Sequence, residues 1–167
     1  VTIEVGTTYT DGGATATDNY DNDTTLTASI VTDVSDVDNQ TVGSYTVSYN
    51  VSDAAGNPAV EVTRTVNVVD TTVPVITLTG AAIVTIEVGT AYTDGGATAT
   101  DNYDNDTTLT ASIVTDVSDV DNQTVGSYTV SYNVSDAAGN PAVEVTRTVN
   151  VVDTTVPVIT LTGEGIV

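Results

Sequence analysis

An acidic segment that occurs twice in the chain carries the residue types that bind hard metal ions. Residues 18–23 (DNYDND) place carboxylates at Asp18, Asp21 and Asp23, and the same spacing recurs at Asp101, Asp104 and Asp106. Oxygen ligands without histidine or cysteine suit Ca²⁺, which takes six to eight oxygens from flexible loops. Repulsion between neighbouring carboxylates also favours a divalent cation. We predict calcium binding here, with a solvated acidic loop as the alternative, and interpret the similar cluster Asp33, Asp36 and Asp38 as solvated.

Other oxygen ligands lie where predicted strands end. Asp53 and Asn57 belong to a predicted turn, Asp70 precedes a predicted linker, and the second copies of these residues are Asp136, Asn140 and Asp153. Loops from alternate strands gather at the ends of a sandwich, so we expect Asp70 to meet Asp101 or Asp104 at the joint between two domains. A cation bound there would stiffen the array. The spacing lacks the glycine and the terminal glutamate of the twelve-residue helix–loop–helix calcium loop.

The elements that must position these residues are themselves duplicated. Residues 1–80 reappear as residues 84–163 with a single difference, Thr8 against Ala91. Self-similarity at a fixed period is typical of tandem arrays. Because the sequence begins and ends in mid-pattern, we expect it to be part of a longer chain.

Alternation of apolar and polar residues dominates each period and predicts strands. One apolar row consists of Tyr45, Val47, Tyr49 and Val51. A second row consists of Val60, Val62, Val66 and Val68, and Arg64 occupies a position in it that the alternation assigns to apolar residues. We expect further strands around Ile3, around Leu26 to Val31 and after Pro74, about seven in each period, and no helix. The predicted fold is all-β: two tandem immunoglobulin-like antiparallel β-sandwiches joined by a short proline-containing linker.

The proline at position 74 sets the predicted domain boundaries, since it favours a short extended connection. Residues 74–154 form a complete repeat, and residues 1–73 form a repeat that lacks the opening strand PVITL. Residues 155–167 contain that sequence again. They are interpreted either as the first strand of a following repeat or as a donor strand that completes another molecule.

The composition excludes several classes of function. The chain has 23 acidic and 2 basic residues, a formal charge of −21, and no Cys or His. Nucleic acid and anionic membranes are therefore not expected as partners, and no segment is long and apolar enough for membrane insertion. Serine and threonine have no conventional base to activate them, so we expect no enzyme activity. For Arg64 we expect a packed stem with a solvated guanidinium, the alternative being a pair with Glu61 or a loop aspartate.

Three segments resemble the bacterial immunoglobulin-like repeats of large surface adhesins, which are related to hyalin-type repeats. They are residues 41–57 (TVGSYTVSYNVSDAAGN), the acidic loop 18–23, and residues 70–76 (DTTVPVI). The resemblance implies an extracellular or cell-surface array, often calcium-dependent, that holds a terminal binding domain away from the cell. It also leads us to expect glycine within the acidic loop, where this chain has Asn22, a residue that tolerates left-handed geometry.

Three hypotheses of function follow. The first is a structural spacer or stalk of a long extracellular adhesin or surface fibre, stiffened by calcium, whose partners are neighbouring repeats. The second is a self-assembling extracellular filament subunit that uses residues 155–167 to complement a neighbour. The third is a carbohydrate- or ice-binding module that presents a threonine face.

Overall fold

The computed structural model describes residues 1–163 and divides the chain into two compact units, Val1–Thr72 and Val73–Val167, which we call the first and second repeat. Of the predicted terminal segment 155–167, residues 164–167 lie outside the described residues. The elements of the first repeat are β1 (Thr2–Glu4), α1 (Asp23–Ala28), β2 (Val31–Asp33), β3 (Gly43–Asn50) and β4 (Val62–Val69). Those of the second repeat are β5 (Val75–Leu78), β6 (Ile83–Glu87), β7 (Ala97–Thr100), α2 (Asp106–Ala111), β8 (Val114–Asp116), β9 (Gly126–Asn133) and β10 (Val145–Val152).

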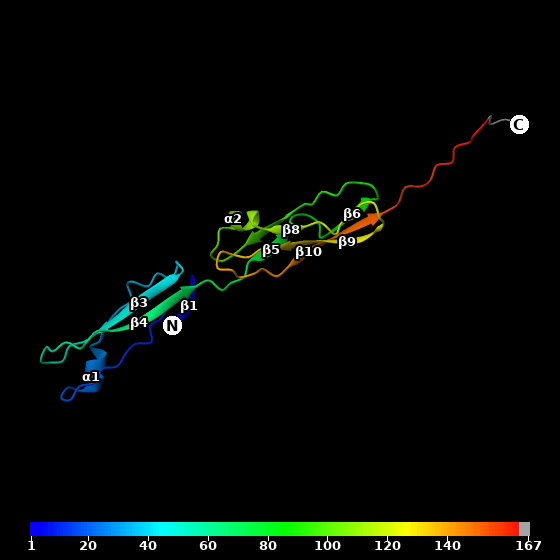
Figure 1. The fold of residues 1–167 in the computed structure, drawn as a ribbon. Coiled ribbons are helices and arrows are strands. Elements are labelled where there is room, and N and C mark those ends of the chain that lie inside the picture. Colours follow the sequence, from blue (N-terminus) through cyan, green and yellow to red (C-terminus); the bar gives the residue numbers. More distant parts are fainter. Residues whose placement is uncertain (164–167) are drawn as a thin grey trace. The chain divides into compact units, whose positions relative to one another are not determined.

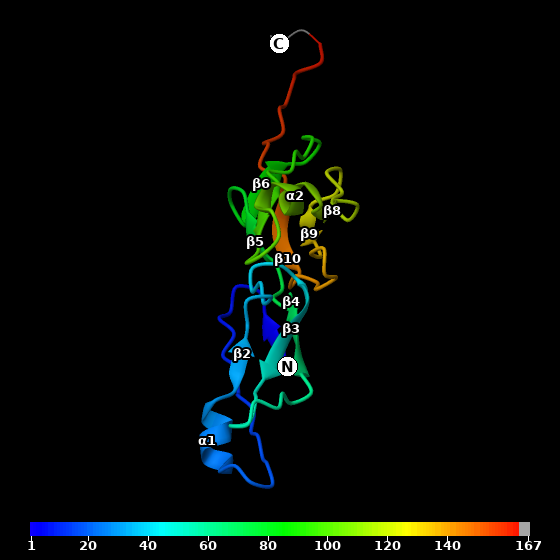
Figure 2. The ribbon, with the colours of Figure 1, turned by 90° about the vertical axis from the view of Figure 1, so that its left-hand side faces the viewer.

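The second repeat is a sandwich of two sheets, whose strands other than β7 are labelled in Figures 1 and 2. One sheet has the strand order β6-β10-β9-β8, and the other pairs β5 with β7. Every pairing is antiparallel except that of β6 with β10, which is parallel over five residue pairs from Thr148↔Ile83 to Val152↔Glu87. The predicted sandwich is confirmed, with a parallel edge that the sequence pattern did not indicate.

Apolar residues of both sheets and of α2 form the core of the second repeat. Ile76 of β5, Ala99 of β7 and Leu109 of α2 pack against side chains of β9 and β10, namely Val130, Tyr132 and Val149. The last three are fully buried, as strand alternation requires of inward positions. The β5–β7 sheet is therefore one wall of this core.

The first repeat has the same four-stranded sheet, in the order β1-β4-β3-β2, with β1 parallel to β4. Its buried core cluster consists of Val47, Tyr49 and Val66. Residues 14–17 have the sequence of β7, ATAT, but form no strand. They have no β5 beside them, because residues 1–72 contain no counterpart of residues 74–79.

Three local predictions are wrong. Leu26 lies in helix α1 rather than in a strand, and Leu109 lies in α2; the six-residue helices take the place of one strand expected in each repeat. Val60 lies outside β4 and is solvent-exposed. Asn22 is not left-handed: it has φ −70° and caps α1 by accepting from the Thr24 and Thr25 N–H groups.

No helix in the described part of the chain has the length and apolarity that crossing a membrane requires.

Candidate functional site

In the loop before each short helix, backbone N–H groups donate to one of the predicted metal ligands. In the first repeat the Asp18 carboxylate accepts from the N–H groups of Tyr20 (3.0 Å) and Asp21 (3.2 Å), and Asp23 accepts from the Asp18 N–H (3.2 Å). In the second repeat Asp101 accepts from Tyr103 (3.0 Å) and Asp104 (3.3 Å), and Asp106 accepts from the Asp101 N–H (3.3 Å). The same loop structure therefore forms twice from the same sequence.

The turn between the two long strands of each repeat lies beside this loop. Asp53 accepts from the backbone N–H of Asn57 (2.7 Å) and from its side-chain amide (2.6 Å). Asp136 and Asn140 form the same pair at 2.7 and 2.7 Å. The Ala54 N–H, 3.4 Å from Asp21 Oδ2, joins turn and loop at the α1 end of the first repeat (Figure 1). One shallow depression there is lined by four of the predicted ligands: Asp18, Asp21, Asp53 and Asn57.

Hydrogen bonding lowers the pKa of two of these acids, Asp18 and Asp53. Backbone hydrogen bonds from Tyr20 and Asp21 lower the pKa of Asp18, against smaller opposing effects of burial and of the Asp53 charge. The side chain and backbone of Asn57 lower the pKa of Asp53. The two arginines of the chain are paired with Asp11 and Asp94 instead. Negative charge in this loop and turn is therefore not balanced by a basic side chain.

The remaining predicted ligands, Asp70 and Asp153, lie at the opposite end of their repeats, directly after β4 and β10. Asp70 accepts from the Thr72 N–H (3.3 Å) and Asp153 from the Thr155 N–H (3.2 Å). Within one repeat the predicted set thus divides between two ends. The meeting of Asp70 with Asp101 or Asp104 stays a prediction.

A glutamate that we did not single out in the sequence holds the chain where it leaves each repeat. The Glu87 carboxylate accepts from the N–H and hydroxyl groups of Thr154 (2.9 and 2.7 Å) and of Thr155 (3.1 and 2.9 Å). Glu4 makes the same contacts with Thr71 and Thr72 at 2.6–3.2 Å. The only signal in the sequence is the pair of threonines that follows Asp70 and Asp153. The fold is needed to identify the glutamate that accepts from these threonines. We call this arrangement the glutamate clamp.

Replacing Glu87 with glutamine is expected to free residues 154 and 155. The hydrogen bonds of Thr154, then those of Thr155, lower the pKa of Glu87 to about 2, so the clamp needs the charged form. Amide exchange at these two residues should accelerate at least about tenfold, as measured by NMR on a chain labelled in the second repeat.

Two comparisons control that result. The variant Glu144→Gln should leave both amides unchanged, because Glu144 accepts from Asn133 instead. In the wild type, the clamp should be fully formed above pH 4.5 and lost as the pH falls from there towards 2, since the lowered pKa of Glu87 stabilises the folded form only above its unfolded value. Protection that is independent of both the variant and the pH would contradict the clamp.

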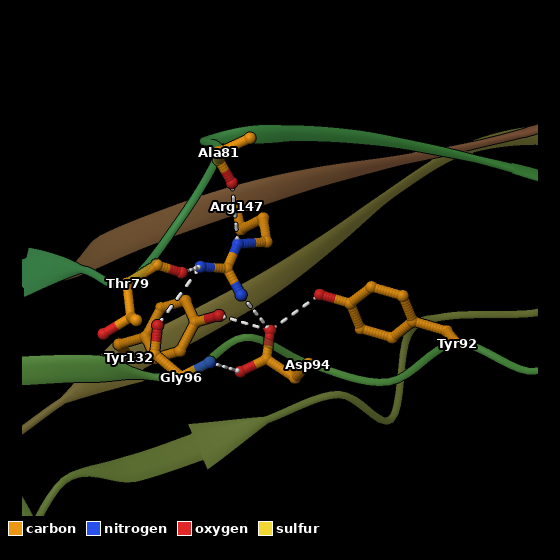
Figure 3. A network of polar contacts seen from close by, with 7 residues as sticks. All are labelled: Thr79, Ala81, Tyr92, Asp94, Gly96, Tyr132 and Arg147. Atoms are coloured by element: carbon orange, nitrogen blue, oxygen red, sulfur yellow. Dashed lines mark hydrogen bonds and ion pairs between the residues drawn. The ribbon is translucent and has the colours of Figure 1, made fainter.

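A buried network around Arg147 joins the two sheets of the second repeat (Figure 3). Its guanidinium forms an ion pair with Asp94 and donates to the carbonyls of Thr79 (2.6 Å), Ala81 (3.0 Å) and Gly96 (3.1 Å). The Arg147 side chain is 1% exposed. For its copy Arg64 we expected a solvated guanidinium, but Arg64 pairs with Asp11, so the loop-aspartate alternative holds there.

Tyrosines complete the network on the Asp94 side. The hydroxyls of Tyr92 and Tyr132 both donate to Asp94 Oδ1 at 2.6 Å, and the Gly96 N–H donates to Oδ2 at 2.8 Å. Burial by itself would raise the pKa of Asp94, but these donors and Arg147 outweigh it and lower the pKa to about 2. Burial, followed by the hydrogen bond to Asp94, raises the pKa of Tyr132. The partly buried carboxylate of Asp94 therefore has hydrogen-bond donors on both oxygens and is charged.

The equivalent network of the first repeat is less complete. Arg64 pairs with Asp11, and its Nη2 donates to the Gly13 carbonyl at 2.8 Å. Residues 1–72 have no counterpart of Thr79 and Ala81 to accept from it, and the Arg64 side chain is 29% exposed. The identical arginine is thus buried only where the chain next to β5 covers it.

Two-sheet β-sandwiches of this size are typical of the immunoglobulin-like class of domain. The chain belongs to the family of bacterial surface protein Ig-like domains, whose family model matches residues 1–68 and 76–151. The predicted family is confirmed, and the chain is a domain pair of a bacterial surface protein.

Among solved structures, the crystal structure of the lipoprotein BT2262 from Bacteroides thetaiotaomicron is similar to this chain. The two are 27% identical over 50% of this chain and 40% of that chain, with a TM-score of 0.41. The match therefore spans less than half of that lipoprotein. No curated protein matches the chain significantly.

Proposed function

We propose that the chain is a load-bearing spacer of an extracellular bacterial surface protein. The observation that carries this proposal is the parallel pairing of β6 with β10. Because the two strands run the same way, tension on the chain ahead of β6 and beyond β10 loads their hydrogen bonds together in shear. An antiparallel pair pulled from one end would open one bond at a time.

The glutamate clamp supports the same function. The chain leaves each repeat through two threonines that a charged carboxylate holds, and charge-assisted hydrogen bonds are among the stronger ones. A chain segment that is held where it leaves a repeat transmits force and direction better than an unconstrained segment. The tandem arrangement itself provides length, and the proposal assigns the chain no catalytic step.

Scattering on chains with two, four and six repeats tests the spacer. The maximum dimension should grow by a constant increment of at least about 25 Å per added repeat, the length of an eight-residue strand. If the dimension instead levels off, as it does for a compact globule, the array is not a spacer.

Calcium is proposed to stiffen this spacer through the acidic loops. The residues fit a hard cation in chemistry: Asp101, Asp104 and Asp106, with Asp136 and Asn140, offer oxygen atoms alone. Their present hydrogen bonds occupy only some of the roughly four acceptor positions of each carboxylate. A bound cation would supply the positive charge that no basic side chain gives this loop.

Titration with CaCl₂ after chelation tests the calcium proposal. Calcium should raise the melting temperature and the maximum dimension of the chain. The double variant Asp101→Asn, Asp104→Asn should weaken this response. The double variant Asp116→Asn, Asp119→Asn should keep it, because these residues are the second copies of Asp33 and Asp36 in the cluster interpreted as solvated. If chelation changes neither quantity, calcium has no structural role, and the spacer proposal still stands on the scattering result.

A further inference from the structure

The second repeat holds its one basic side chain in the middle of a sheet. Arg147 lies in β10, which is paired with β6 on one edge and with β9 on the other. Arg147 lies opposite Val130 of β9, and the N–H of the next residue, Thr148, donates to the Ala82 carbonyl at 2.9 Å. The guanidinium is enclosed by the network in Figure 3. Neither the side chain of Arg147 nor the peptide bond that follows it is therefore free.

The arginine of the first repeat occupies the same position in its sheet. Arg64 lies in β4, between β1 and β3, opposite Val47 of β3, and it pairs with Asp11. These two arginines are the only basic residues in the sequence, which contains no lysine. The loops 117–125 and 134–144 consist of acidic, hydroxyl, amide, small and apolar residues instead. Each repeat thus confines its one base to a strand that has a neighbouring strand on both edges.

This placement matters to one class of enzyme. Proteases of trypsin specificity recognise the residue before the cleaved bond by placing its cationic side chain against a carboxylate in their specificity pocket. Exposed loop tips are the usual sites of such cleavage. The loops of this chain offer carboxylates but no cation. The one cation of the second repeat enters such a pocket only after β10 has separated from both β6 and β9.

We propose that the repeats resist proteases that cleave after basic residues, because the arginine that such enzymes recognise is held in a central strand. Cleavage then requires the repeat to unfold, and its rate follows the small population of the open form. For small domains that population is about one in 1000 or less. This resistance would let an extracellular array persist among secreted proteases, and it does not rest on the load-bearing function.

Trypsin digestion of the 1–167 chain, followed by mass spectrometry of the fragments, tests the proposal. The reference is a peptide of residues 143–152, which contains the same bond without the sheet. In the folded chain the bond after Arg147 should be cleaved at least about 1000-fold more slowly than in this peptide.

Two lysine variants show whether the placement of the base decides the result. Gln123→Lys puts a base in the loop 117–125, where Gln123 is exposed and its side-chain amide donates to the adjacent Asn122. The bond after position 123 should be cleaved at least about 100-fold faster than the bond after Arg147, because loops open far more often than central strands.

Thr146→Lys is the matched control within the sheet. Thr146 is exposed, precedes Arg147 in β10 and lies opposite Ser131 of β9. The bond after position 146 should stay as resistant as the bond after Arg147, although the new side chain reaches solvent. Both substitutions replace exposed residues, so both variants should fold like the wild type, which their melting temperatures would check.

Three outcomes would overturn the proposal. One is cleavage after Arg147 as fast in the folded chain as in the peptide. Another is a Gln123→Lys variant that resists trypsin as well as the wild type does, because the loops themselves would then exclude the protease. The third is a Thr146→Lys variant that is cleaved as fast as Gln123→Lys, because the sheet would then give no protection. None of these outcomes bears on the growth of the maximum dimension with repeat number, which tests the spacer separately.

Discussion

The variant Arg147→Met is expected to lower the free energy of unfolding of the second repeat by about 3–5 kcal/mol. The side chain is 1% exposed and holds both Asp94 and three backbone carbonyls. Removing it leaves the largely buried Asp94 carboxylate without its countercharge and leaves the carbonyls of Thr79 and Ala81 without this donor. Calorimetry of the intact chain would show the transition of the second repeat moving to lower temperature.

The same change in the first repeat is the matched control. Arg64→Met should cost clearly less than Arg147→Met, because the Arg64 guanidinium is partly solvated and bonds a single carbonyl. Equal losses in the two repeats would show that the segment after β5 contributes nothing to the network. A loss below about 1 kcal/mol for Arg147→Met would contradict the buried ion pair itself.

The second large effect is expected from Gly95→Ala, which should destabilise the second repeat by about 1–3 kcal/mol. A Cβ at this position would lie 2.8 Å from the Thr79 carbonyl oxygen and 3.2 Å from Arg147 Nη1. The carbonyl belongs to the backbone next to β5 and moves only if that strand moves. Denaturant unfolding of the intact chain measures the loss.

Gly12→Ala provides the control from the same sequence context. Its Cβ would meet Arg64 Nη1 at 3.4 Å, an ordinary contact, so the change should stay within about 0.5 kcal/mol. A loss at Gly12 as large as that at Gly95 would contradict the role of the Thr79 carbonyl.

The sequence predicted the sandwich well because alternation is a local signal. The rows through Tyr45, Val47 and Tyr49 and through Val66 and Val68 lie in the strands β3 and β4, and their inward residues are buried. The short helix escaped prediction because six residues show no helical period. The capping residue Asn22 before Asp23 and two threonines was its only signal.

The other features of the structure could not be predicted, because they depend on contacts between residues that lie far apart in the chain. The partner of Arg64 is 53 residues away at Asp11, and nothing near either residue indicates the pair. The sequence ATAT is a strand at Ala97–Thr100 but not at residues 14–17, because only the first of these has β5 beside it. Identical residues thus differ in structure through their surroundings. The sequence is equally limited in predicting the calcium ligands, because the loops that would supply them come together only in the folded protein.

Force spectroscopy on a chain of several repeats tests the load-bearing spacer most directly. Discrete unfolding events are expected, each releasing about 250 Å of chain for a repeat of some 80 residues. Because the parallel pair β6–β10 is loaded in shear, the unfolding force should drop when Ile86→Pro removes one of its hydrogen-bond donors. A smooth extension at low force, without steps, would contradict the account.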